Sequence, residues 1–273
     1  MKKQEFIIGV KTDIGNKKNI NQDSFLCKTG NLNGSDFGLF LVCDGIGGLS
    51  KGEIASNKVV KSFDEWWKTN LKKIMIESSD IFNDIKKSLE DTMYKANNKI
   101  IQYSQENNIQ LGTTATLIFI MDGRYYIAHI GDSRVYEIRK NINHLTEDHT
   151  HYAKLIKEGK FEEAKKVKKS VLVQCIGIKS NINLYISEGY INKDTNFLIC
   201  SDGFYNKMNE SKIKKIFKSR KVKEYYMQEK CEELVEEVKS KRERDNITLI
   251  ALKVNLKRKS LINYIKDIFI KRR

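Results

Sequence analysis

Five aspartates lie at the ends of apolar, β-rich runs, where a carboxylate is an unusual residue. Asp44 follows LFLVC, Asp132 follows YYIAHIG, Asp202 follows FLICS, Asp245 precedes NITLIALKV, and Asp23 borders the run SFLCK. A charge at the end of a buried strand is costly unless a cation pairs with it. Carboxylate oxygens from several segments suit hard divalent ions such as Mg²⁺, Mn²⁺ or Ca²⁺. The pattern therefore predicts a shared cation site.

The alternative explanation is that each aspartate only begins a turn, because Asp-Gly is a common turn sequence. That explanation suffices for one aspartate and is weaker for four that end similar runs. Two neighbouring Mg²⁺ or Mn²⁺ ions would activate a water molecule for attack on phosphorus. Motifs of other phosphoryl-transfer chemistry are absent: no cysteine has an arginine six residues on, and there is no Asp-x-Asp pair and no Walker loop.

Hydrophobic spacing predicts the elements that must position these aspartates. Strands are expected at Phe6–Lys11, Ser24–Lys28, Phe37–Cys43 and Asn246–Val254, with one hairpin turning at Asp122-Gly123 and a second through Asn192–Asn196. Helical spacing is found at Glu53–Trp67, Ile81–Gln102 and about 150–167, 209–219 and 223–240. Strands that arrive as hairpins, with helices in separate pairs, predict one α+β domain of helix-covered antiparallel sheets.

Composition excludes several classes of protein. The chain of 273 residues has 40% hydrophobic residues, which can supply a substantial core. Its five cysteines are odd in number and widely spaced, which is typical of buried thiols in a reducing compartment. No apolar stretch approaches the roughly 18 residues of a membrane span, and the N-terminus lacks the apolar run of a signal peptide. We therefore expect a cytoplasmic protein.

Eight blocks along the chain resemble the motifs of one family. They are TDIGNKKNINQDSF, FLVCDGIGG, LGTTATLIFI, AHIGDSRVYEI, HLTEDHT, LVQCIG, FLICSDGF and RDNITLIAL. In this order and spacing they resemble the metal-dependent protein phosphatases of the protein phosphatase 2C family, in its compact bacterial form, from about residue 6 to 254. The resemblance implies a sandwich of two antiparallel β-sheets flanked by α-helices on both sides. It also implies hydrolysis of phosphoserine and phosphothreonine on proteins, in opposition to a bacterial Ser/Thr kinase.

The resemblance also implies roles for individual residues around two Mn²⁺ or Mg²⁺ ions. Asp44 would bridge both ions, the Gly45 carbonyl would bind one of them, and Asp202 and Asp245 would bind the other. Asp132 with Asp202 matches the positions that hold a third, weaker ion in bacterial members. These expectations make the Asp44 segment one half of a site whose other half lies far along the chain.

Two further residues are expected to act on water and on the substrate. Asp23 would hold metal-bound waters, and Lys18 stands where the family usually has an arginine that grips the substrate phosphate. Lysine keeps the charge but lacks the planar fork that binds two phosphate oxygens, so weaker phosphate binding is expected. Gln22 replaces a common glutamate, and Ile46 lies where animal members have a histidine proposed as the general acid.

Two lysine-rich segments allow more than one interpretation. Thr150–Ser170, with seven lysines, matches the flap of the family; it is either a solvated helix face or a basic lip that favours acidic or multiply phosphorylated partners. We assign 1–255 to the catalytic domain and 256–273 to a basic amphipathic C-terminal tail. Such a tail can lie on an anionic membrane, or dock on the sandwich or on a partner protein.

Two other functions compete with phosphatase activity. The chain could be a degenerate phosphatase that only binds phosphoproteins, an idea that depends on Lys18 and is opposed by the complete set of aspartates. The net charge of +15 suggests nucleic-acid binding, but no basic and aromatic motif supports it. We therefore expect phosphoprotein substrates and a cognate kinase as partners, and no nucleic acid.

Overall fold

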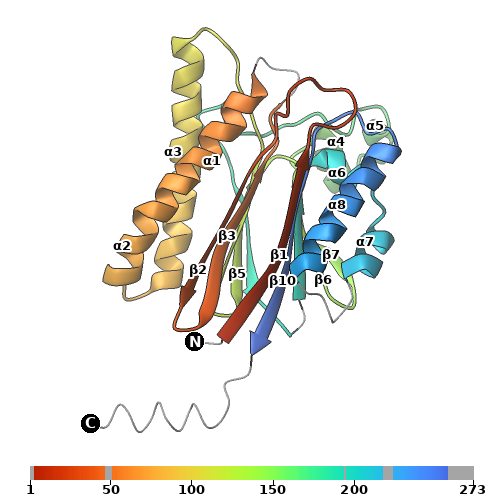
Figure 1. Ribbon diagram of the computed structural model, residues 1–273. Coiled ribbons are helices and arrows are strands. Elements are labelled where there is room, and N and C mark those ends of the chain that lie inside the picture. The colour runs from red at the N-terminus through yellow and green to blue at the C-terminus, as the bar shows by residue number, and fades with distance from the viewer. Residues whose placement is uncertain (1–2, 47–50, 194, 218–223, 258–273) are drawn as a thin grey trace, which may run out of the picture.

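A computed structural model describes residues 3–46, 51–193, 195–217 and 224–257, in which two five-stranded antiparallel sheets pack face to face (Figure 1). Sheet A has the order β1 (Lys3–Asp13), β10 (Ile247–Lys257), β9 (Thr195–Cys200), β6 (Arg134–Ile138) and β7 (Ile142–His144). Sheet B has the order β2 (Ser24–Leu32), β3 (Ser35–Cys43), β4 (Ala115–Met121), β5 (Arg124–Ile130) and β8 (Tyr185–Tyr190). The predicted sandwich is confirmed.

Helices cover the outer face of each sheet. The outer face of sheet B packs against α1 (Gly52–Lys68), α2 (Asn70–Glu77) and α3 (Ile81–Glu106), and that of sheet A against α7 (Glu210–Phe217) and α8 (Glu224–Ser240). On β3, Leu39 and Leu41 face the helices while Phe40 and Val42 face the other sheet. Both faces of this strand are therefore buried, which explains its unbroken apolar run.

The hairpin at Asp122-Gly123 is confirmed. It joins β4 to β5, and both central residues have positive φ, 52° at Asp122 and 70° at Gly123. A two-residue turn with two left-handed residues matches the right-handed twist of the strands that it joins. The turn signal in the sequence was therefore sufficient to predict both the strands and their pairing.

The second predicted hairpin, through Asn192–Asn196, is wrong. β8 pairs with β5 at the edge of sheet B, whereas β9 lies between β10 and β6 inside sheet A. The chain therefore crosses from one sheet to the other between these strands. The burial patterns explain the error: β8 alternates as an edge strand does, whereas every residue of β9 is buried. Each apolar run indicates a strand, but neither run indicates the strand with which it pairs.

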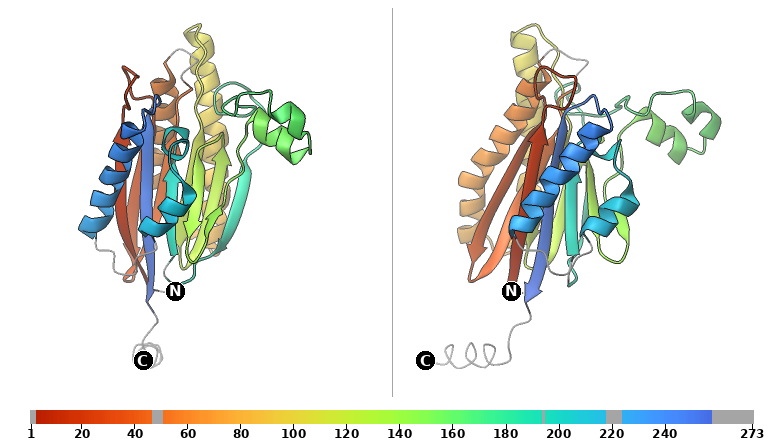
Figure 2. Two further views of the ribbon diagram at one scale, coloured as in Figure 1. Left: turned by 90° about the vertical axis from the view of Figure 1, so that its right-hand side faces the viewer. Right: turned by 45° about the vertical axis from the view of Figure 1, so that its right-hand side comes forward.

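The helix predicted at 150–167 is two short helices. They are α4 (His151–Lys157) and α5 (Phe161–Ala164), and they project from the body of the sandwich (Figure 2). Gly159 separates them with φ of 74°, a left-handed conformation that ends a helix and favours glycine. The lysine-rich segment is thus a projecting arm that continues into the loop before β8. We call residues 150–170 the flap.

β10 ends at Lys257, so residues 258–273 of the predicted tail lie outside the described residues. Within the described part of the chain, no helix has the length and apolar character needed to cross a bilayer.

Asn97 of α3 provides a test of how the loop before β8 is held. Its side chain is fully buried; Nδ2 donates to the carbonyl of Lys179 at 2.8 Å, and Oδ1 accepts from the amide of Gly177 at 2.7 Å. Asn97→Ala leaves these groups without their partner, so we expect a loss of about 2 kcal/mol in the free energy of unfolding. Urea denaturation measures it.

Asn98→Ala is the matched control, because Asn98 is exposed on the same helix. It should leave the free energy of unfolding unchanged or slightly higher, since alanine favours helices. Equal effects of the two substitutions would contradict the role assigned to Asn97.

Candidate metal centre

The five aspartates meet at one edge of the sandwich. Asp44 follows the last residue of β3, Asp132 lies in the turn between β5 and β6, and Asp202 opens α6 (Asp202–Tyr205) directly after β9. Asp23 and Asp245 precede β2 and β10, which run antiparallel to β3 and β9. The ends of these strands therefore coincide, as the pairs Ser24 with Cys43 and Leu249 with Cys200 show. The structure thus brings together the aspartates that the sequence singled out.

Asp44 lies at the centre of this cluster. Burial raises the pKa of its carboxyl well above the usual range, and the charges of Asp23, Asp202, Asp132 and Asp245 raise it further. Burial also raises the pKa of Asp202 to about 6, with Asp245 as the next cause. A hydrogen bond between Asp202 and Asp44 acts in the opposite direction. The carboxylates are close enough to disfavour one another's charge, which is the condition a bound cation relieves.

Asp23, which precedes β2 of sheet B, is held by a residue that follows β9 of sheet A. Ser201 donates its hydroxyl to Asp23 Oδ2 at 2.9 Å, and the amide of Thr248 donates to Ser201 Oγ at 3.0 Å. The other oxygen, Oδ1, is buried and has no hydrogen-bond partner among the described residues. Burial raises the pKa of Asp23 to about 7. A fixed carboxylate with one free oxygen can accept a hydrogen bond from a water molecule or a ligand in the cluster.

The backbone at Asp44 and Gly45 is fixed by its neighbours. The backbone amide of Asp44 donates a hydrogen bond of 2.8 Å to the hydroxyl of Thr114. The backbone amide of Thr114 donates one of 2.8 Å to the carbonyl of Asp44. The amide of Gly45 donates to the carbonyl of Gln22 at 3.1 Å. A Cβ at Gly45 would lie 2.6 Å from the carbonyl oxygens of Gln22 and Gly52. Only glycine allows three backbone segments to approach this closely beside Asp44.

Lys18 reaches the cluster from the loop between β1 and β2. Its Nζ lies 2.9 Å from Asp245 Oδ1, and both side chains are partly exposed. Burial opposes the charge on Lys18, but the hydrogen bond and the charge of Asp245 raise its pKa, with Asp44 and Asp202 adding to the effect. Lys18 is therefore a charged group at the solvent side of the cluster.

The loop that carries Lys18 is tied to the residue after Asp245. Asn246 Nδ2 donates to the carbonyls of Ile14 and Ile20 at 2.9 Å and 3.2 Å. Gly15 has φ of 75°, and a Cβ there would lie 2.2 Å from the carbonyl oxygen of Asp245. The loop thus lies directly against the segment that supplies Asp245, which places Lys18 at the metal edge.

Asp132 lies near Arg134, whose charge lowers the pKa of the Asp132 carboxyl. Nearby Arg134 directs its guanidinium to Asp148, with Nε and Nη2 at 3.0 Å and 2.6 Å from the two carboxylate oxygens. The guanidinium also lies over the ring of Tyr205, 3.7 Å from its centroid. Burial raises the pKa of Asp132 well above its usual range, and the charge of Asp202 adds to the effect.

The donor chemistry of the cluster fits a hard divalent cation. The groups that converge are carboxylates and the backbone beside Asp44, and Asp23 keeps a buried oxygen without a described partner. Among the residues that the structure describes, no three His, Cys, Asp or Glu side chains are already arranged so that they could hold a metal ion. The composition and the electrostatics of the site therefore support the predicted cation, and the ligand set stays a prediction.

Sequence reasoning did not single out the residues that hold the aspartates in place. They are hydroxyl and amide residues beside the acidic positions: Thr114, Ser201, Asn246 and Thr248. All four fall inside the blocks LGTTATLIFI, FLICSDGF and RDNITLIAL. Their small polar side chains within otherwise apolar blocks were the available signal, because a buried hydroxyl or amide needs a partner.

Comparison with known proteins agrees with this fold and site. A sequence model described as protein phosphatase 2C matches residues 15–238, well over half of the chain. "Protein phosphatase PhpP" of Streptococcus pneumoniae is 30% identical over 256 residues, which cover 91% of this chain and 97% of the relative. "Serine/threonine phosphatase stp" of Listeria innocua is 26% identical over 227 residues, which cover 81% and 86%. The chain belongs to the protein phosphatase 2C family.

Solved structures share the fold. A bacterial serine phosphatase superposes with a TM-score of 0.79 at 23% identity, over 93% of this chain and all of the other. The serine/threonine phosphatase of S. agalactiae does so with a TM-score of 0.75 at 26% identity, over 93% and 100%.

The raised pKa values predict how pH acts on stability without metal. In EDTA, folded protein keeps protons on Asp23, pKa about 7, and Asp202, pKa about 6. The unfolded chain releases these protons near pH 4, so the free energy of unfolding should fall as pH rises from about 4 to 7. Saturating Mn²⁺ should remove the fall, because it favours the ionised carboxylates. Urea denaturation at several pH values, with EDTA and with Mn²⁺, measures both slopes.

Asp23→Asn should weaken the pH dependence of the free energy of unfolding in EDTA, because it removes one of the titrating groups. Asp91→Asn, on the exposed side of α3, should leave it as in the wild type. A slope that is the same in all three proteins would show that the cluster does not carry the effect.

Proposed function

We propose that this protein hydrolyses phosphoserine and phosphothreonine in phosphoproteins, with Mn²⁺ or Mg²⁺ held by the aspartate cluster. The observation that carries the proposal is the convergence of five carboxylates from both sheets on one edge, where burial and the charges of the other four raise the pKa of Asp44. Membership of the protein phosphatase 2C family and relatives named as serine/threonine phosphatases support the same activity. The activity needs no cysteine: the pKa of Cys43, beside Asp44, is raised well above its usual range by burial.

The residues that would hold two ions are proposed from the match of this chain to the motifs of the family. Asp44 would contact both ions, the Gly45 carbonyl one of them, and Asp202 and Asp245 the other. Asp132 with Asp202 would hold a third ion. A related catalytic domain, PstP, with a TM-score of 0.72 at 22% identity, was solved in complex with two manganese ions. When bound, such ions supply an activated water and neutralise charge on the phosphoryl oxygens.

The other residues of the site would position the reactants. Asp23, fixed by Ser201, would accept a hydrogen bond from a water molecule through its free Oδ1. Lys18, charged and partly exposed at the rim, would bind a phosphoryl oxygen of the substrate. It would exchange its contact with Asp245 for one with the phosphate, because a single ammonium has several donors but no fixed fork.

The cellular setting is proposed from the sequence. We propose a cytoplasmic enzyme that opposes a Ser/Thr kinase, with a catalytic domain of residues 1–255 and a basic tail of 256–273. The wide spacing of the cysteines, four of which are buried and none of which is in a disulfide, supports a reducing compartment. The basic and apolar residues of the tail support contact with an anionic membrane or a partner protein.

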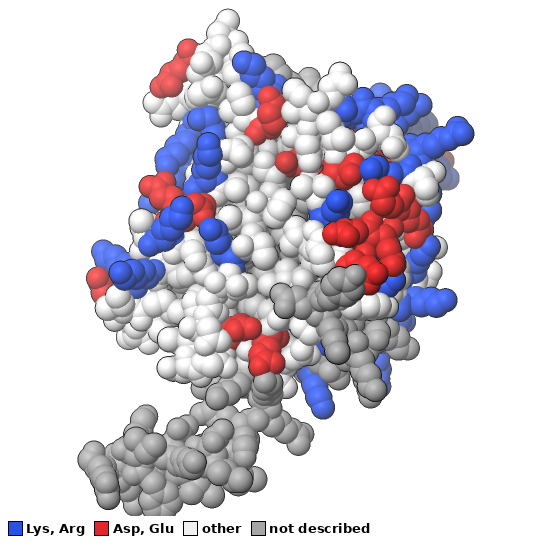
Figure 3. All heavy atoms as spheres, viewed as in Figure 1, with Lys and Arg blue, Asp and Glu red and all other residues white. Residues whose placement is uncertain are grey.

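The distribution of charge on one face of the molecule favours protein substrates over nucleic acid. On the face shown in Figure 3, acidic side chains gather over α8, which carries Glu229, Glu232, Glu233, Glu236 and Glu237. Basic side chains form separate groups on the same face, divided by uncharged surface and by the acidic area (Figure 3). The excess positive charge of the chain is therefore not a single basic surface on this side, as tracking a phosphate backbone would need.

Asp202→Asn tests the metal-dependent mechanism. Because it removes a charged ligand from the cluster, we expect Mn²⁺-dependent phosphate release from a phosphothreonine peptide to fall at least about a hundredfold. Asp91→Asn, an exposed aspartate of α3, is the matched control and should retain wild-type activity. Activity that persists in EDTA, or in Asp202→Asn, would refute the mechanism, and a wild-type protein that binds the peptide without turnover would favour a binding module.

Lys18 tests how the phosphate is bound. Lys18→Ala should raise KM for the phosphopeptide about tenfold, because a charge-assisted hydrogen bond is lost. Lys18→Arg should lower KM, because the guanidinium fork can bind two phosphoryl oxygens. Lys17→Ala, an exposed neighbour, is the control and should keep the wild-type KM. Steady-state kinetics at saturating Mn²⁺ compare the four proteins, and equal KM values in all of them would remove Lys18 from the site.

A further inference from the structure

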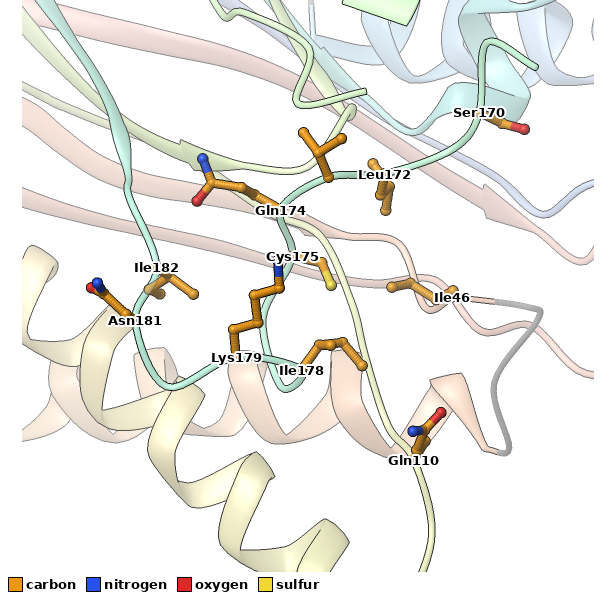
Figure 4. A pocket seen from close by; sticks show the side chains of 11 residues that line it. Ile46, Gln110, Ser170, Leu172, Gln174, Cys175, Ile178, Lys179, Asn181 and Ile182 are labelled. Carbon is orange, nitrogen blue, oxygen red and sulfur yellow. The ribbon is translucent and has the colours of Figure 1, made fainter. Parts of the chain in front are cut away.

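An apolar groove lies beside the metal edge, between the loop before β8 and the first residues after Asp44. Its cavity has a volume of about 470 Å³. Figure 4 shows side chains of Ile46, Leu172 and Ile178 pointing into the same space, with Cys175 on the wall. The volume is within the range of about 300–1,000 Å³ that is typical of ligand pockets. Burial raises the pKa of Cys175 to about 11, so the groove offers apolar surface and no reactive thiolate.

The groove is continuous with the metal edge through hydrogen-bonded backbone. Thr113 bridges Gly45 on one side and Ile176 on the other. Thr113 and Ile176 exchange two backbone hydrogen bonds, of 3.1 Å and 2.9 Å. Neighbouring strands lie about 4.8 Å apart, so two such steps place the wall of the groove about 10 Å from the Gly45 backbone. An extended peptide covers that distance in about three residues.

The wall of the groove is rigid while its lining stays exposed. The buried side chain of Asn97 binds the amide of Gly177 and the carbonyl of Lys179. Yet Ile178, between these anchors, is 44% exposed, and Val173 on the same loop is 36% exposed. Apolar side chains that a fixed loop holds in solvent next to a catalytic edge indicate a binding surface.

A basic group completes the groove. Lys179 is exposed and extends along the groove beside Cys175 toward Gln174 (Figure 4). Four of the flap lysines form ion pairs with glutamates, namely Lys154, Lys157, Lys160 and Lys165. Lys179 is in none of the ion pairs found among the described residues, so its charge is available to a ligand. The groove therefore suits an apolar group with negative charge next to it.

We propose that this groove binds an apolar side chain of the phosphoprotein substrate, within about three residues of the phosphorylated residue, and that Lys179 favours an acidic residue beside it. The inference rests on the proposed phosphatase function and specifies the substrates of that same site. The distance between the groove and the metal edge sets how many residues separate the apolar residue of the substrate from the phosphorylated one. The charge of Lys179 sets which residue is preferred next to the apolar one.

The test is a set of phosphothreonine peptides that are identical except for one residue. Leucine replaces serine at each position from four before to four after phosphothreonine, and kcat/KM is measured with Mn²⁺ by phosphate release. We expect leucine at one position within about three residues to raise kcat/KM about tenfold over serine, because hydrophobic pockets discriminate by about this factor. At an adjacent position, glutamate should exceed lysine by about fivefold.

Substitutions of groove residues test whether the groove causes the preferences for leucine and glutamate. In Ile178→Ser, the ratio of kcat/KM between the leucine and serine peptides should fall to about one, while Ile76→Ser, exposed on α2, should keep the wild-type ratio. In Lys179→Glu, the preference for peptides with glutamate over those with lysine should reverse. Lys99→Glu, at an exposed position of α3, should keep the wild-type preference. Each ratio is taken within one protein, so a general change in activity cancels.

The outcomes separate this inference from the proposed function. Wild-type protein that releases phosphate neither from p-nitrophenyl phosphate nor from any peptide with Mn²⁺ would refute the phosphatase itself. Wild-type protein that cleaves all peptides alike, or a leucine preference that survives in Ile178→Ser, would overturn the groove alone. A leucine preference that appears only when residues 258–273 are deleted would mean that the chain's own C-terminus, and not the substrate, occupies the groove in the full-length protein. This outcome would also overturn the proposal.

Discussion

Mutual repulsion of carboxylates at one edge of the sandwich is the constraint on which the rest of the structure depends. Asp44 sits among four other aspartates, and burial together with their charges raises its pKa well above the usual range. A chain gains nothing in stability from such an arrangement by itself, since buried charge without a partner is unfavourable. The cluster therefore makes physical sense as a place prepared for positive charge, which the folded scaffold must hold open against repulsion.

The scaffold does this by fixing backbone on both sides of the edge. Antiparallel pairing makes the ends of β3 and β9 coincide with the starts of β2 and β10, so residues far apart in sequence become neighbours. Hydroxyl and amide side chains then tie each acidic segment: Thr114 holds Asp44, Ser201 holds Asp23, and Asn246 holds the loop of Lys18. Each tie joins segments that are far apart in the sequence, and together they orient groups that would otherwise turn away from one another.

Sequence patterns predicted the acidic positions and the class of fold, because both leave local marks. An aspartate after an apolar run is visible in one segment, and so is the turn at Asp122-Gly123. The partner of a strand is a long-range property, and for that reason the hairpin through Asn192–Asn196 was wrong and β8 and β9 lie in different sheets. The ties made by Ser201 and Asn246 were missed for the same reason, since their partners are 178 and 232 residues away.

Chemistry and recognition are divided between two parts of this edge. The acidic cluster is built on strand ends, where ten hydrogen-bonded strands limit movement, and its chemistry requires only a phosphoryl group and ions. The groove is built on the loop before β8, whose backbone is fixed by Asn97 while its side chains Val173 and Ile178 stay exposed. Substitution of an exposed residue such as Ile178 can change what binds without moving Asp44. A common catalytic edge can therefore serve different substrates when only this loop varies.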